Sequence, residues 1–139
     1  MDKALLDTDI FSEIFKRIDR RVAARATAYR YAFGGYTLSV ITVLEVVKGW
    51  QKLHREDRIQ RFLVDISDAE VLALDRATAE IAGRICGDLE GTGQPIGLAD
   101  AMIAATALQH NLTLVTGNLS HYQRIQGLGY SLKLDSWRT

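Results

Sequence analysis

Acidic side chains stand at three places in the chain where an apolar segment meets a polar one. Asp7 follows the apolar run 4–6, Glu45 lies just beyond the run 38–41, and Asp100 begins an alanine-rich stretch. Carboxylates that gather in space repel one another unless a cation lies between them. Oxygen-only ligands of this kind suit Mg²⁺ or Mn²⁺. The residue types and their placement therefore predict a divalent-metal site built from distant parts of the chain.

A fourth polar group extends this pattern near the end of the chain. The apolar run 112–115 is followed by Thr116, Gly117 and Asn118. In an open α/β sheet, ligands bind outside the carboxyl ends of the strands, so all four groups would meet at one edge. Thr116 and Asn118 also fit a purely local role, because Thr and Asn commonly cap the helix that follows them.

Each acidic position has a local structural interpretation as well. Asp7 and Asp9 could form an Asx turn and cap the helix that follows. Thr42 and Glu45 have the spacing of a capping box. Asp100 could complement the positive end of its helix dipole, but its helix is apolar nearly all round, and a buried carboxylate needs a partner. All these local roles would have to coincide at one sheet edge, so we favour the metal site.

The acidic side chains indicate a reaction that depends on a bound divalent metal ion. A bound divalent ion polarises a phosphate and lowers the pKa of a bound water. The three histidines, His54, His110 and His121, fall in a polar stretch, a turn and a short helix, and each is expected to be solvated. With no histidine placed as a general base, the expected nucleophile is a metal-activated water.

Alternating strands and helices must position these groups. The sequence predicts strands at 3–6, 37–41, 71–74, 112–115 and 131–134. It predicts helices at 10–18, 20–33, 42–50, 55–64, 77–90, 98–109 and 119–125. This alternation is typical of an α/β fold, here with a mostly parallel central sheet of about five strands flanked by helices on both faces.

Length and composition narrow the class of protein. The chain has 139 residues, 17 basic and 17 acidic side chains and a net charge of zero, which excludes a strongly basic nucleic-acid binder. The lone Cys86 cannot form an internal disulfide and is interpreted as a core thiol in a reducing cytoplasm. No apolar run approaches the roughly 18 residues of a membrane span. A cytoplasmic protein is expected.

Three segments and one helical residue carry a resemblance to a known family. The segments are Leu-Leu-Asp-Thr-Asp at 5–9, Pro-Ile-Gly-Leu-Ala-Asp and its alanine-rich continuation at 95–107, and Leu-Val-Thr-Gly-Asn-Leu-Ser-His-Tyr at 114–122, with Glu45 between the first two. Their order and spacing resemble PIN-domain ribonucleases, and most closely the VapC toxins of type II toxin–antitoxin systems. The resemblance implies that residues 1–139 form a single PIN-like domain.

The resemblance also implies roles for individual residues. Asp7, Glu45 and Asp100 match the catalytic, metal-binding carboxylates of the family, and Thr8, Thr116 and Asn118 match positions that support the site. Asn118 stands where many members have a fourth acid, so either one or two metals would fit. The implied activity is an Mg²⁺- or Mn²⁺-dependent endoribonuclease that leaves a 5′-phosphate and a 3′-hydroxyl. The implied partners are an RNA substrate, a VapB-like antitoxin and a second copy of the chain.

Two other functions remain open from the sequence. A PIN-like module that binds RNA or protein without cleavage is favoured by Asn118 alone. The motif Asp7-Thr8-Asp9 also opens haloacid-dehalogenase phosphotransferases, in which the first Asp is the nucleophile. That class has Thr or Val where this chain has Phe11, and its downstream Lys is missing because no Lys lies between Lys52 and Lys133.

Overall fold

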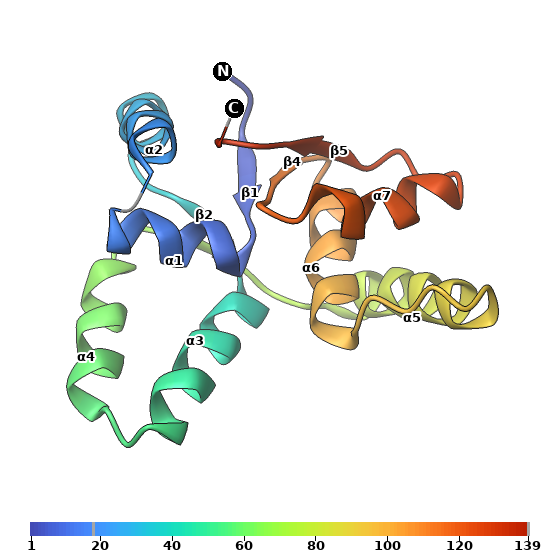
Figure 1. The fold of residues 1–139 in the computed structure, drawn as a ribbon, viewed down its shortest axis with the longest axis horizontal. Coiled ribbons are helices and arrows are strands. Elements are labelled where there is room, and N and C mark those ends of the chain that lie inside the picture. Colours follow the sequence, from blue (N-terminus) through green and yellow to red (C-terminus); the bar gives the residue numbers. More distant parts are fainter. Residues whose placement is uncertain (18, 139) are drawn as a thin grey trace.

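Five short strands alternate with seven helices in the computed structural model, which describes residues 1–17 and 19–138 (Figure 1). The strands are β1 (Ala4–Leu6), β2 (Thr37–Ser39), β3 (Glu70–Leu72), β4 (Thr113–Val115) and β5 (Lys133–Asp135). The helices are α1 (Thr8–Lys16), α2 (Arg20–Phe33), α3 (Val40–Lys52), α4 (Glu56–Asp65), α5 (Arg76–Gly91), α6 (Leu98–Gln109) and α7 (Leu119–Gly127). Ile18, the last residue of the first predicted helix, lies outside the described residues.

All the strand pairs are parallel, which confirms the α/β class. Hydrogen bonds join β1, β4 and β5 into one sheet in the order β1-β4-β5, and they join β2 to β3 in a second. The five predicted strands thus form two hydrogen-bonded sheets rather than one. Strands β1 and β2 lie side by side, and the buried Tyr29 hydroxyl lies between them, 3.1 Å from the backbone N and O of Ala4 and 3.0 Å from Thr37 Oγ1. This side chain therefore takes the place of ladder hydrogen bonds at the junction.

The central strands bury both of their faces. Because successive side chains of a strand point to opposite sides, Leu5 packs with α5, α6 and α7, whereas Leu6 packs with α1 and α2. Helix α6 is buried nearly all round, as its composition predicts. Cys86 lies half-buried against the hydrophobic cluster that contains Leu5, and burial raises the pKa of its thiol. No helix of the described residues is long and apolar enough to cross a membrane.

Helix α3 begins two residues earlier than the sequence predicts. Ser39, the last residue of β2, is its N-cap, and the Ser39 hydroxyl accepts a hydrogen bond from the Ile41 N–H at 3.0 Å. Thr42 therefore lies inside the first turn and is not the cap. The predicted strand 37–41 is cut short for the same reason, because a serine with extended backbone at residue 39 starts the helix as soon as the strand ends.

Candidate active site

Asp7 lies at the carboxyl end of β1, where it caps α1. Its side chain is 6% exposed, and its two oxygens accept hydrogen bonds from the Thr8 N–H and the Thr116 hydroxyl, both at 2.9 Å. Burial, followed by the negative charges of Asp9 and Asp100, raises the pKa of Asp7 to about 7. The capping role predicted for Asp7 is thus confirmed, and the same carboxyl is held in a buried, acidic setting.

The loop after β4 lies against Asp7 because β1 and β4 are parallel neighbours, with Leu6 opposite Val115. The Thr116 hydroxyl donates to Asp7 and accepts a hydrogen bond from the Asn118 N–H at 3.0 Å. Thr116 therefore supports Asp7 and also shapes the start of α7. Asn118 is the N-cap of α7, but its side chain is exposed and makes no capping hydrogen bond within the described residues.

Glu45 projects from α3 toward the start of α1. The Thr8 hydroxyl donates to Glu45 Oε1 at 2.6 Å and lies 2.9 Å from the Thr42 hydroxyl. Since a carboxylate only accepts, the Thr8 proton goes to Glu45 and the Thr42 hydroxyl donates to Thr8. The capping-box interpretation of Glu45 is wrong, because Ser39 caps this helix. Glu45 is instead held by the hydroxyl of Thr8, the residue that follows Asp7 in the chain.

Asp100 lies in the first turn of α6 and has a partner that the sequence does not reveal. His121 Nε2, on α7, lies 2.9 Å from Asp100 Oδ2 and 2.9 Å from the Ile96 carbonyl oxygen. Both of these atoms accept hydrogen bonds, so Nε2 carries the proton. The expectation that His121 is solvated is wrong, since its side chain is only 21% exposed. Gly97, with a φ of 93°, makes the turn between Ile96 and α6.

Tyr122 adds a buried hydroxyl to the same region. The residue is completely buried, and within the described part of the chain its hydroxyl has no hydrogen-bond partner. Burial and the nearby negative charges of Asp7 and Asp100 raise its pKa. Asp7 and Asp100 lie close enough to act on this hydroxyl, so three polar groups from β1, α6 and α7 converge on one buried place. The sequence gives no sign of this, because a tyrosine in an amphipathic helix is ordinarily a core residue.

The donor set fits a hydrated divalent cation. Within the described residues, no three carboxylate, imidazole or thiolate side chains converge tightly enough to enclose a metal. The negative charge of Asp100 nevertheless contributes to the raised pKa of Asp7, after burial and Asp9, so the two carboxylates lie near each other. Mg²⁺ is commonly held by one or two carboxylates and keeps several of its waters. A pair of carboxylates beside an unpartnered hydroxyl meets that requirement.

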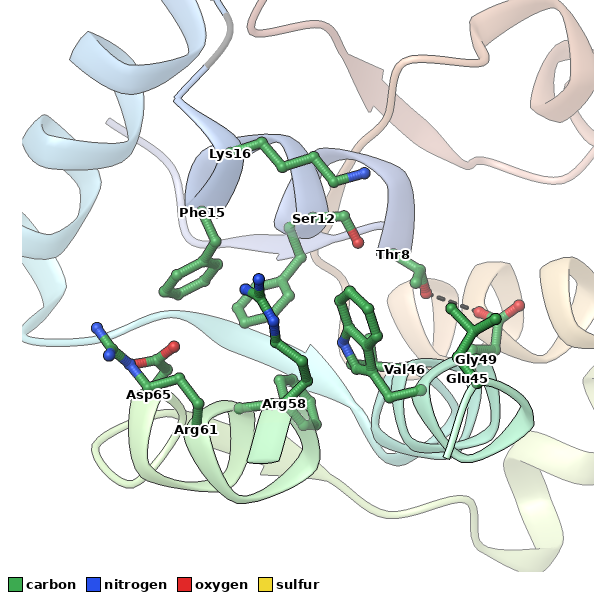
Figure 2. A pocket seen from close by; sticks show the side chains of 14 residues that line it. Thr8, Ser12, Phe15, Lys16, Glu45, Val46, Gly49, Arg58, Arg61 and Asp65 are labelled. Carbon is green, nitrogen blue, oxygen red and sulfur yellow. Dashed lines mark hydrogen bonds and ion pairs between the residues drawn. The ribbon is translucent and has the colours of Figure 1, made fainter. Parts of the chain in front are cut away.

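A groove leads away from this site between α1, α3 and α4. It has a volume of about 620 Å³, and Thr8 and Glu45 line one end (Figure 2). Phe15, Arg61 and Asp65 lie at the other end, while Lys16 and Arg58 project over the space between (Figure 2). The groove therefore runs from the acidic site to the far ends of α1 and α4.

Comparison with known proteins gives consistent matches over most of the chain. The family model described as PIN domain matches residues 4–126. The tRNA(fMet)-specific endonuclease VapC of Shigella flexneri is 32% identical over 132 residues, which cover 92% of this chain and 96% of that protein. Ribonuclease VapC1 of Methanocaldococcus jannaschii is 27% identical over 130 residues, or 94% of this chain and 86% of that protein.

Solved structures give the same result. A chain in the DNA-bound VapBC structure from Salmonella typhimurium superimposes with a TM-score of 0.81 at 30% identity, covering 99% of both chains. A chain in the structure of FitAB bound to a DNA fragment superimposes with a TM-score of 0.73 at 26% identity, covering 98% of this chain and 96% of that one. The folds correspond over their whole length.

Proposed function

Because the chain belongs to the PIN-domain family, among the VapC ribonucleases, we propose that it is a metal-dependent endoribonuclease and the toxin of a VapBC-type pair. The observation that best supports this is the buried Asp7 carboxyl, held by Thr8 and Thr116 at the sheet edge and electrostatically coupled to Asp100. A phosphotransferase that begins with Asp7-Thr8-Asp9 has a different fold family, so that alternative is set aside.

Asp7, Asp100 and Glu45 are proposed to hold Mg²⁺ or Mn²⁺. A bound ion would supply Lewis-acid polarisation of the phosphate and would lower the pKa of a water. The chain's own residues orient these three carboxylates. Thr8 and Thr116 fix both oxygens of Asp7, and the Thr8 hydroxyl fixes Glu45.

His121 and Asn118 have different places in this proposal. His121 Nε2 holds one oxygen of Asp100, which leaves the other oxygen free for the ion. Asn118 shapes the loop through its backbone N–H, and its exposed side chain is available to bound RNA. We therefore place Asn118 among the supporting residues rather than among the metal ligands.

Two partners follow from the proposed function. The solved relatives named above come from VapBC and FitAB assemblies, and we propose that this chain likewise pairs with a VapB-like antitoxin. We also propose a homodimer. Co-expression with the adjacent small open reading frame, followed by size-exclusion chromatography with light scattering, tests both proposals. A monomeric protein that does not bind that gene product would contradict both proposals.

Cleavage of RNA by the purified protein is the decisive test of the activity. We expect cleavage with Mg²⁺ or Mn²⁺, none after chelation with EDTA, and products with 5′-phosphate ends. Asp100→Asn should bind RNA but not cleave it. Metal-independent binding without any cleavage would instead identify a binding module, the alternative that Asn118 leaves open.

A further inference from the structure

The groove beside the active site combines exposed aromatic surface with positive charge. Its floor includes Phe11 and Phe62, both buried, while Phe15 is 43% exposed and Trp50 is partly exposed. The Arg58 guanidinium lies over the Trp50 ring, 5.5 Å from its centroid. The Thr8 and Glu45 end of the groove is the edge of the proposed metal site (Figure 2).

The cations over this groove are not neutralised by neighbours. Within the described residues, neither Lys16 nor Arg58 has a carboxylate within ion-pair distance. At the far end, Arg61 is paired with Asp65 at 3.2 Å, so that acid adds little repulsion. An anion that approached Glu45 along the groove would therefore pass two unpaired positive charges.

We propose that this groove is a subsite for an unpaired base of the RNA substrate, next to the phosphate that is cleaved. Trp50 provides the stacking surface once the Arg58 guanidinium, which lies over its ring in the free protein, turns away to contact a flanking phosphate. Lys16 contacts a second phosphate. Aromatic rings interleaved with free cations are typical of single-strand binding, because every base has a face that stacks and every phosphate is anionic. The volume also lies within the range of about 300–1,000 Å³ found for small-ligand sites. This inference rests on the proposed ribonuclease function.

The position of Trp50 explains why the base must be unpaired. Trp50 and Glu45 both lie on α3 and both line the groove, so the base stacks on the helix that carries a proposed metal ligand. A base within a duplex is already stacked on both faces and cannot enter the groove without being extruded. The subsite would therefore select loops, bulges and single strands.

Fluorescence of the tryptophans gives a direct test of binding that does not depend on cleavage. The wild-type protein in EDTA is titrated with a short unstructured RNA oligonucleotide. We expect saturable quenching from Trp50, because the only other tryptophan, Trp137, is 3% exposed. Trp50→Leu should abolish the quenching and weaken RNA binding on the order of tenfold.

Two further variants distinguish the contribution of the Arg58 charge to RNA binding from that of the Trp50 ring. Arg58→Gln, at an exposed position, should lower the slope of log K against log salt by about 0.7, as expected for one lost phosphate contact on a single strand. Arg76→Gln is the matched control, because Arg76 is exposed at the start of α5 and lies outside the groove. It should change neither the affinity nor the slope. With metal present, Trp50→Leu should raise KM about as much as it weakens binding and leave kcat nearly unchanged.

Two outcomes would overturn the subsite, and a third would overturn the proposed function alone. Wild-type protein that cleaves RNA, together with Trp50→Leu and Arg58→Gln proteins that match it in KM and salt dependence, would show that the base binds elsewhere. Loss of antitoxin binding in Trp50→Leu with unchanged RNA affinity would assign the groove to the protein partner instead. A wild-type protein that binds RNA with quenching but never cleaves it would contradict the proposed function and leave the subsite standing. Melting curves of both variants check that they fold.

Discussion

Asp7 serves both the fold and the proposed chemistry, and its protonation links the two. It caps α1 and accepts hydrogen bonds from Thr8 and Thr116, which favour the charged form. Burial and the neighbouring charges of Asp9 and Asp100 outweigh those bonds and raise its pKa to about 7. A carboxyl held in this way is costly to ionise until a cation compensates its charge.

The raised pKa of Asp7 predicts that the metal-free protein loses stability as the pH rises. The folded state keeps a proton that the unfolded state releases near pH 3.8, so stability falls between pH 3.8 and about 7 and is level above that. Between pH 5 and pH 8 the loss should be about 2.5 kcal/mol, at about 1.4 kcal/mol per pKa unit. Urea unfolding in EDTA at both pH values measures it. Asp7→Asn should largely remove this dependence, and an equal slope in both proteins would refute the assignment.

His121 is predicted to position Asp100. Its Nε2 proton is shared between Asp100 Oδ2 and the Ile96 carbonyl, which fixes the carboxylate relative to α7. Loss of such an outer contact typically costs 10–100-fold in metal affinity or activity. His121→Ala should therefore weaken Mn²⁺ binding at least about tenfold, and His121→Gln, which keeps a donor, should lose less. Calorimetric Mn²⁺ titration distinguishes this from a packing role, in which both variants would bind Mn²⁺ like the wild type.

Asp100 lies in the first turn of α6, where two electrostatic effects on the stability of the protein oppose each other. The helix dipole favours an acid there by about 0.3–1 kcal/mol. Repulsion between Asp7 and Asp100 opposes it, and the His121 contact adds to the favourable side. The sign of the stability change on neutralising Asp100 therefore reports which effect is larger.

We expect repulsion to win in the metal-free protein. Asp100→Asn should abolish RNA cleavage and yet melt at the same temperature as the wild type or higher in EDTA, because active sites commonly trade stability for function. Mg²⁺ or Mn²⁺ should raise the melting temperature of the wild type more than that of the variant, since metal binds only the folded site. A scanning-calorimetry comparison with and without metal tests both statements. An Asp100→Asn protein that cleaves RNA at the wild-type rate would show that Asp100 is not part of the metal site.

At the scale of the whole molecule, the last residues of the described chain contact the loop that follows β4. Arg138 donates from Nη1 to the Gly117 carbonyl at 3.2 Å and pairs through Nη2 with Glu13 Oε2 at 2.5 Å. Glu13 is only 12% exposed and lies on α1, so the contact joins residues more than a hundred positions apart. The guanidinium lies so close to Gly117 that a Cβ there would collide with it. The loop that carries Thr116 is thereby held against α1.

Arg138→Ala should lower both stability and activity. Its removal leaves the mostly buried Glu13 carboxylate without its partner, which costs more than breaking an exposed pair. Arg84→Ala is the control, because the Arg84–Glu80 pair is more than 60% exposed on both sides and should contribute at most about 1 kcal/mol. Urea unfolding and RNA cleavage rates of the two variants are compared. Equal effects would show that the Arg138 contact has no special structural role.

The order of the helices and strands, and the positions of the acidic residues, can be predicted from the sequence. Helices α2 and α6 begin and end where the sequence predicts, because Gly34 ends the first with a φ of 81° and Gly97 precedes the second. The central strands can be recognised in the sequence because β1 is apolar and buried throughout, and β4 buries Leu114 and Val115. Asp7 stands out because it directly follows such a strand, and Asp100 because it begins a helix that is apolar nearly all round.

Which of these groups lie in contact follows from the packing of the helices and strands. The contact between His121 and Asp100 joins α7 to α6, and the unpartnered Tyr122 hydroxyl lies beside carboxylates on two other elements. Local sequence patterns fix the period of a helix but not which neighbour its polar residues face. The Tyr29 hydroxyl lies between β1 and β2, where the two sheets meet, and contacts Ala4 and Thr37. Contacts of this kind depend on packing across the whole chain, which no local pattern records.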